Sequence, residues 1–130
     1  MQVTKDTNVL IVDDMAAMRK ILTNILNEHY QIFNIIQAGN GKEAIASLQK
    51  TQGAVELILC DWNMPEMNGM DFFKFCQNSD EYKKIPFIMI TAESDKAHVL
   101  EALKAGVNNY ILKSFSAMEI KNRLDKIFKK

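Results

Sequence analysis

Five short runs of apolar residues, rich in Val, Ile and Leu, recur along the chain with longer amphipathic segments between them. In chain order, the runs are residues 8–12, 32–38, 55–60, 86–90 and 108–112. Their length and β-branched composition are typical of buried strands, and the first segment between them places Met18, Ile21 and Ile25 on one helical face. Strict alternation of strand and helix favours a parallel sheet, because right-handed crossovers place helices on both of its faces. The sequence therefore predicts an open, doubly wound α/β fold of five βα units.

The length of 130 residues limits what this pattern can build. A closed barrel of eight βα units needs roughly 200 residues or more, so an open sheet is the expected form. The sequence holds no internal repeat or linker, and only two prolines and five glycines interrupt it. We therefore expect one domain over residues 1–130, with residues 1–7 as a short lead and no output domain.

The charge balance narrows the classes of partner. Sixteen Lys and Arg residues face sixteen Asp and Glu residues, so the formal net charge is zero. Nucleic-acid binders and membrane-surface proteins carry a basic excess, and we expect neither partner here. No apolar run approaches the roughly 18 residues of a membrane span, and the start of the chain lacks the apolar core of a signal peptide. We expect a cytoplasmic protein whose two cysteines are reduced packing residues.

Polar side chains follow four of the five predicted strands at the point where each strand ends. They are Asp13 and Asp14 after the first strand, Asp61 after the third, Thr91 after the fourth and Lys113 after the fifth. Ligands of open parallel sheets bind beyond these carboxyl ends. The second strand ends in a Gly-Asn-Gly turn without a reactive side chain, which suits an edge strand. The strand order 2-1-3-4-5 satisfies both observations and brings the three aspartates together.

Three carboxylates in one pocket raise one another's pKa values, and a divalent cation relieves that repulsion. A set of oxygen ligands without His or Cys favours a hard ion, and an incomplete protein shell completed by water suits Mg²⁺. We expect Asp14 and Asp61 to be direct ligands and the backbone carbonyl of Asn63 to be a third. Asp13 is expected to act through a water molecule.

Lys113 and Thr91 extend this prediction from metal binding to phosphoryl transfer. An ammonium and a hydroxyl beside a metal-bound carboxylate suit an incoming phosphoryl group, whose oxygens need charge neutralisation and hydrogen bonds. Asp61 is then the nucleophile, and its product is an acyl phosphate.

Each of these residues also has a purely structural interpretation. Asp13 or Asp14 alone would suit a cap of the following helix, Asp61 a turn, and Thr91 a cap of a helix over about residues 95–105. A small Asp-dependent phosphatase is an enzymatic alternative, but it needs a second acid where this chain has Asn63. A flavodoxin-like cofactor binder is a third alternative, which the acidic pair after the first strand disfavours because it would repel a phosphate.

Several spaced motifs together match one known family. The motifs are Asp13-Asp14, Asp61, Met64-Pro65-Glu66-Met67-Asn68-Gly69, Thr91-Ala92 and Lys113. On these residues, the chain resembles the receiver domains of bacterial two-component response regulators over residues 8–130. A second set of residues is most similar to the single-domain chemotaxis regulators of that family: Asp61-Trp62-Asn63-Met64-Pro65, Thr91-Ala92-Glu93, Gly106 and Tyr110. The resemblance implies a flavodoxin-like (βα)5 fold.

The resemblance also implies a switch rather than a conventional enzyme. A histidine kinase would donate its phosphoryl group to Asp61 in a Mg²⁺-dependent reaction, and the acyl phosphate would later hydrolyse. The hydroxyl of Thr91 would move toward the phosphoryl group, and Tyr110 would rotate into the space it leaves, reshaping the face of the fourth helix, fifth strand and fifth helix. Asn63 and Glu93 would tune the lifetime of the phosphoryl group.

The implied partners are proteins. They are a sensor or chemotaxis histidine kinase, the flagellar motor switch protein or another output protein, and a phosphatase, all acting on a monomer. Three other roles remain open: a phosphate sink, a relay outside chemotaxis, and a binding module that works without phosphorylation.

The chain departs from the family pattern at three places. Ser114 follows Lys113 where the family has a proline with a cis peptide, and a non-proline cis bond costs on the order of 2.5 to 4 kcal/mol. Residues 15–17 replace the usual aromatic and hydroxyl residues beside the site. The expected output face is rather apolar, which suits a different partner or self-association, and its apolar residues are Val99, Leu103 and Val107.

Overall fold

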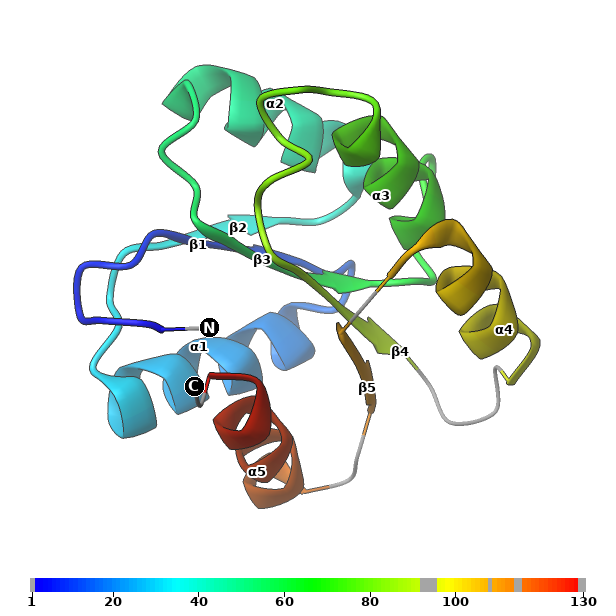
Figure 1. The fold of residues 1–130 in the computed structure, drawn as a ribbon. Helices are drawn as coiled ribbons and strands as arrows, with labels where there is room; N and C mark the ends of the chain where they lie inside the picture. The colour runs from blue at the N-terminus through cyan, green and yellow to red at the C-terminus, as the bar shows by residue number, and fades with distance from the viewer. Residues whose placement is uncertain (1, 92–95, 108, 114–115, 129–130) are drawn as a thin grey trace.

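The computed structural model describes residues 2–91, 96–107, 109–113 and 116–128, which form five parallel strands and five helices in strict alternation (Figure 1). The strands are β1 (Val9–Val12), β2 (Ile35–Ala38), β3 (Leu57–Asp61), β4 (Phe87–Thr91) and β5 (Asn109–Leu112). The helices are α1 (Ala16–Tyr30), α2 (Gly41–Thr51), α3 (Gly69–Gln77), α4 (Lys96–Ala105) and α5 (Ala117–Phe128). The sheet order is β2-β1-β3-β4-β5, which confirms the predicted topology and places β2 at an edge.

Helices cover both faces of the sheet (Figure 1). Side chains of α2, α3 and α4 pack on one face, and side chains of α1 and α5 pack on the other. Within β1, Leu10 and Val12 face the first layer, and Val9 and Ile11 face the second. All four side chains are buried, as expected of a central strand in a doubly covered sheet. This burial on both faces is the reason that the strands appear in the sequence as unbroken apolar runs.

Three sequence-based expectations need correction. Strand β2 begins at Ile35 rather than at residue 32, because the chain still turns after α1: Gln31 has a φ of 55°, and the Ile32 amide donates to the Leu26 carbonyl. The buried stripe of α1 is Leu22, Ile25 and Leu26, whereas Ile21 is 37% exposed. Val107 packs in the core rather than on the expected output face.

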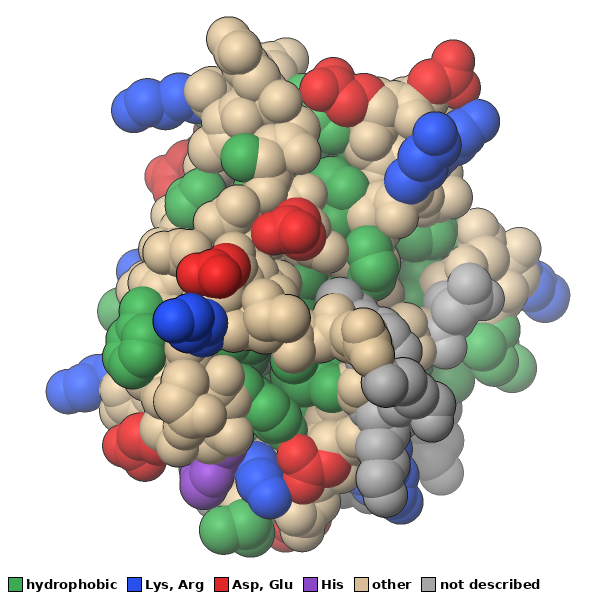
Figure 2. All heavy atoms as spheres, turned by 60° about the vertical axis from the view of Figure 1, so that its left-hand side comes forward, with side chains coloured by type: hydrophobic (Ala, Val, Ile, Leu, Met, Phe, Trp, Pro, Cys, Tyr) green, Lys and Arg blue, Asp and Glu red, His purple; other side chains and the backbone are tan. Residues whose placement is uncertain are grey.

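The surface charges are mixed. On the face shown in Figure 2, acidic and basic side chains are interspersed with hydrophobic ones, in keeping with the equal numbers of both charges in the sequence. Among the described residues, no helix is both long and apolar enough to span a bilayer.

A contact joins the C-terminal ends of α1 and α5, the two helices of the second layer. The Tyr30 hydroxyl donates to Asp125 at 2.5 Å, and its ring meets Phe128 edge-on with centroids 4.9 Å apart. Burial, followed by the nearby carboxylate, raises the pKa of Tyr30 above its usual range, so the hydroxyl stays a donor at any ordinary pH.

Replacing Tyr30 with phenylalanine is expected to lower the free energy of unfolding by about 1 kcal/mol, because it removes this hydrogen bond and keeps the ring contact. Urea unfolding of the two proteins at pH 7 measures the difference. An unchanged midpoint would show that water replaces the hydroxyl without loss.

Candidate functional site

Three aspartates meet at the carboxyl edge of the sheet, as the sequence predicts. Asp13 directly follows β1, and Asp61 is the last residue of β3. Because Val12 and Cys60 are paired in the parallel ladder, the next residues along both strands are neighbours. One carboxylate oxygen from each of Asp13, Asp14 and Asp61 lies within 4.8 Å of the others. Asp13 and Asp61 are buried, and Asp14 is exposed at the mouth of the cluster.

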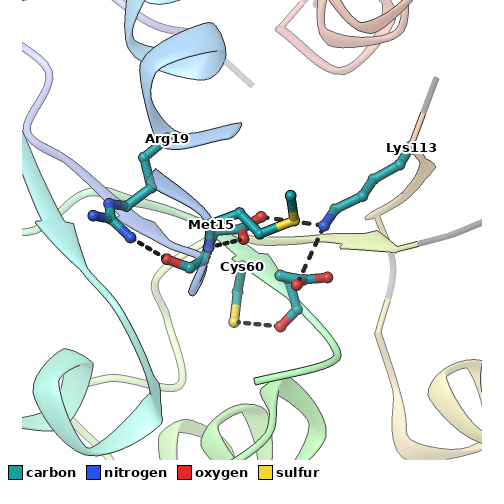
Figure 3. Close-up of polar contacts among 6 residues, drawn as sticks. Met15, Arg19, Cys60 and Lys113 are labelled. Carbon is teal, nitrogen blue, oxygen red and sulfur yellow. Dashed lines mark hydrogen bonds and ion pairs between the residues drawn. The ribbon is translucent and has the colours of Figure 1, made fainter. Parts of the chain in front are cut away.

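Lys113 reaches the same cluster from the far side of β4. Its ammonium nitrogen lies 3.3 Å from Oδ2 of Asp13 and 3.3 Å from Oδ2 of Asp61 (Figure 3). The backbone amide of Lys113 also donates to the Thr91 carbonyl at 2.5 Å, which ties the ends of β4 and β5 together. The structure thus brings the Lys113 ammonium next to the aspartates, and its role in the reaction stays a prediction.

The electrostatics of the cluster follow from this geometry. Burial, and after it the charge of Asp13, raises the pKa of Asp61 to about 6, although Lys113 acts in the opposite direction. Burial also raises the pKa of Asp13, against the opposing effects of the Met15 amide and Lys113. Burial alone would lower the pKa of Lys113, but the two carboxylates outweigh it and raise that pKa. One ammonium among three carboxylates leaves an excess of negative charge.

This donor set fits a hard divalent cation. Its members are carboxylate oxygens that already converge, and Asp14 leaves one side open to solvent. Oxygen ligands and an open shell that water completes are the features that Mg²⁺ requires. The cluster is thus suited to metal binding.

The β1–α1 loop does not use its aspartates as a helix cap. The N-cap of α1 is Met15, whose side chain makes no capping hydrogen bond. Instead, Oδ1 of Asp13 accepts a hydrogen bond from the Met15 amide at 2.9 Å, which leaves Oδ2 for Lys113. The helix-cap interpretation of the acidic pair is therefore wrong.

The chain after β3 folds back tightly on Asp61. The Gly69 amide donates to the Trp62 carbonyl at 2.8 Å, and a Cβ atom at Gly69 would lie 2.1 Å from the Asp61 carbonyl oxygen. The Cys60 thiol donates to the same Asp61 carbonyl oxygen at 3.1 Å (Figure 3). Asn68 caps α3 by accepting from the Asp71 amide at 2.9 Å. This turn fixes the backbone that carries Asp61, and it was missing from the sequence-based site.

The remaining predicted residues surround this cluster or lie outside the description. Thr91 is fully buried at the end of β4, Tyr110 is half-buried on β5, and Asn63 is exposed two residues beyond Asp61. Glu93 and Ser114 lie outside the described residues, as does the peptide bond before Ser114. The functional roles assigned to all these residues stay predictions.

Trp62 connects the cluster to the neighbouring helix. It directly follows Asp61 and is buried, and its indole stacks on the ring of His98 from α4, with centroids 4.2 Å apart and planes 6° from parallel. The fluorescence of Trp62 can therefore report on changes at Asp61, the predicted nucleophile.

Comparison with known proteins defines the family. The model of the response regulator receiver domain matches residues 9–125, and the chain belongs to this family. CheY-3 of Vibrio cholerae is 41% identical over 126 residues, which cover 97% of this chain and 95% of the relative. CheY1 of Helicobacter pylori is 43% identical over 118 residues, which cover 90% and 93% of the two chains.

Solved structures agree with the observed fold. The crystal structure of the CheX–CheY–BeF3–Mg²⁺ complex from Borrelia burgdorferi contains a chain that matches with a TM-score of 0.80 and 30% identity, covering 95% of this chain and 90% of that one. CheY4 of Vibrio cholerae matches with a TM-score of 0.79 and 28% identity, covering 93% and 98%. The chain is therefore homologous to the CheY chemotaxis response regulators, and its role is that of a phosphorylation switch in two-component chemotaxis signalling rather than a conventional enzyme.

Proposed function

We propose that Asp61 is the residue on which this switch is phosphorylated, in a Mg²⁺-dependent reaction with a chemotaxis histidine kinase. The observation that carries the proposal is the convergence of three carboxylates on one ammonium, with Asp61 buried at the centre. In this reaction, a carboxylate oxygen of Asp61 attacks phosphorus, and the bond from phosphorus to the histidine nitrogen of the kinase breaks. The histidine leaves with the electron pair of that bond.

The residues around Asp61 have different roles in this reaction. Asp14, Asp61 and the Asn63 carbonyl would hold Mg²⁺ directly, and Asp13 would hold it through water. The bound ion supplies positive charge against the phosphoryl oxygens. Lys113 neutralises charge from the opposite side and keeps Asp61 oriented, as its contact at 3.3 Å already does. With a pKa of about 6, Asp61 is largely ionised at pH 7.5, as a nucleophile must be.

The output step involves Thr91 and the face formed by α4, β5 and α5. The Thr91 hydroxyl donates to a phosphoryl oxygen, and Tyr110 moves into the space that Thr91 leaves. The face carries exposed apolar side chains that suit a protein partner: Leu100 and Leu103 on α4, which are 63% and 59% exposed, and Met118 on α5, which is 54% exposed.

The proposed partners are cytoplasmic proteins. A chemotaxis histidine kinase supplies the phosphoryl group, the flagellar motor switch protein receives the signal, and a phosphatase removes the group, while Asn63 and Glu93 set its lifetime. The names of the relatives support the chemotaxis partners, and a CheX–CheY complex is among the similar structures. The unphosphorylated protein is proposed to be a monomer.

Metal titration followed by phosphoryl donor tests this proposal. Mg²⁺ is expected to change Trp62 fluorescence with a saturable dependence, and acetyl phosphate is then expected to add one phosphoryl group, seen by intact mass. In Asp14→Asn, the Mg²⁺ midpoint is expected to rise about tenfold or more, because an exposed ligand is lost while the fold is kept. The adduct should still form at saturating Mg²⁺.

Two other results would assign another role. A metal response without an adduct would favour the binding module that works without phosphorylation. Sustained release of phosphate from a simple phosphoester would favour the Asp-dependent phosphatase.

A further inference from the structure

Arg19 joins the acidic loop to the edge strand of the sheet. From the first turn of α1, its Nη1 nitrogen donates to the Asp13 carbonyl at 2.6 Å (Figure 3). Its Nε donates to Oε1 of Gln37 on β2 at 2.9 Å. The guanidinium therefore has two fixed points, one on the loop and one on the sheet.

The carbonyl that Arg19 holds belongs to the peptide unit between Asp13 and Asp14. The other polar groups of Asp13 are held elsewhere: its amide donates to the Ala38 carbonyl at 3.0 Å, and its carboxylate binds the Met15 amide and Lys113. The orientation of the Asp13 carbonyl fixes the plane of the peptide, since the peptide bond is rigid. The plane of this peptide in turn sets the direction in which the backbone continues into Asp14.

Geometry, rather than charge, distinguishes this contact. The charged neighbours that act on the Asp13 carboxyl are Lys113 and Asp14. A guanidinium presents several donors in one rigid plane, so it can serve a carbonyl and an amide oxygen together. A lysine ammonium at the same position supplies the charge but not this planar fork.

We propose that Arg19 is a positioning residue that sets the metal affinity of the aspartate cluster by fixing the Asp13–Asp14 peptide, with Gln37 orienting its guanidinium. The inference rests on the proposed Mg²⁺ site and adds a residue that does not touch the ion. Outer residues that orient metal ligands change metal affinity by about 10- to 100-fold when they are replaced.

Mg²⁺ titration of Trp62 fluorescence measures the effect in the absence of any partner or phosphoryl donor. Arg19→Met and Arg19→Lys are both expected to weaken Mg²⁺ binding about tenfold, because neither keeps the two contacts. Lys20→Met is the matched control: it removes one positive charge from an exposed neighbour on the same helix and is expected to change the affinity less than about twofold. Thermal unfolding without metal confirms that each variant is folded at the titration temperature.

Gln37→Leu gives a milder version of the same test, because it removes only the second fixed point. Its Mg²⁺ midpoint is expected to lie between those of the wild type and Arg19→Met, and this variant decides the outcome if Arg19→Met fails to fold.

Two results would overturn the inference itself, and a third would overturn the metal site on which it rests. Equal Mg²⁺ affinity in the wild type and both Arg19 variants would show that the loop keeps its geometry without the guanidinium. Wild-type affinity in Arg19→Lys alone would assign the effect to charge. A wild-type protein without any Mg²⁺ response would instead remove the proposed metal site itself, a failure that the wild-type titration alone identifies.

Discussion

Replacing Asp61 with asparagine is expected to abolish the phosphoryl adduct and, in metal-free buffer at pH 8, to stabilise the fold by about 2 to 3 kcal/mol. The adduct is lost because an amide cannot form the acyl phosphate. The folded state becomes more stable because the substitution removes an unfavourable charge. Burial and Asp13 raise the pKa of Asp61 from 3.8 to about 6, which makes its ionised form costly in the folded state. Intact mass after acetyl phosphate treatment and urea unfolding in EDTA measure the two effects.

The pH dependence of stability explains why Asp61→Asn is expected to stabilise the protein. The carboxyl at position 61 binds its proton more tightly in the folded state than in the unfolded chain, so its contribution to wild-type stability falls as pH rises from about 4 to about 6. The Asp61→Asn protein lacks that contribution. The two proteins are therefore expected to have similar stability near pH 4, and the variant is expected to be more stable above pH 7.

Saturating Mg²⁺ provides the control, because it stabilises the wild type by binding the folded state and acts less on a variant that lacks a ligand. The difference at pH 8 should then shrink or reverse. Equal metal-free stabilities at pH 8 would contradict the cost assigned to the buried carboxylate, and a full phosphoryl adduct in the variant would contradict the nucleophile.

Replacing Gly69 with alanine is expected to destabilise the protein by about 3 kcal/mol and to weaken Mg²⁺ binding at the same time. The added Cβ would lie 2.1 Å from the Asp61 carbonyl oxygen, and its other near neighbours are also backbone atoms, of Asp61 and Trp62. Backbone cannot move aside as a side chain can, so the turn itself must shift, and overpacking of this kind costs typically 1 to 3 kcal/mol or more. Urea unfolding and the Trp62 titration report the two losses.

Gly39→Ala is the matched control for this variant. The Cβ at that position would meet the Glu43 side chain at 3.3 Å, and all three of its nearest neighbours are atoms of that flexible carboxylate. A small change in stability and an unchanged Mg²⁺ midpoint are expected. A Gly69→Ala protein that behaves like the control would show that the turn after β3 does not determine the position of Asp61.

The sheet could be predicted from sequence because burial on both faces leaves a strong signal. Each inner strand is an unbroken apolar run, and the polar residue after it marks the edge where ligands bind. The start of β2 was missed because α1 ends on Gln31 in a left-handed conformation, where a glycine would have marked the turn. Ile21 and Val107 were assigned to the wrong side because a difference of one position along a helix or loop decides whether a side chain faces the core or the solvent.

The acidic cluster and its lysine could be predicted because the strand order alone brings them together. Arg19 could not, because its importance lies in a contact with a backbone carbonyl. Gly69 lies in one of the motifs that carry the family resemblance, but its structural role depends on close contact with the Asp61 backbone and could not be predicted. A carbonyl has no side-chain signature, so no motif marks the residue that holds it. The Trp62–His98 stack was missed for a similar reason, since it joins a loop and a helix that lie far apart along the chain.

The two cysteines, Cys60 and Cys76, are both buried, one in the sheet beneath Asp61 and the other on α3. Burial raises the pKa of both thiols, so neither one reacts while its surroundings stay closed. Both thiols lie in the layer that α2, α3 and α4 form with the sheet, so their alkylation by a thiol reagent in the native protein records how often that layer opens around each of them. Faster modification of Cys76 than of Cys60 would give the rate at which α3 opens locally. Equal rates would give the rate of unfolding of the whole molecule.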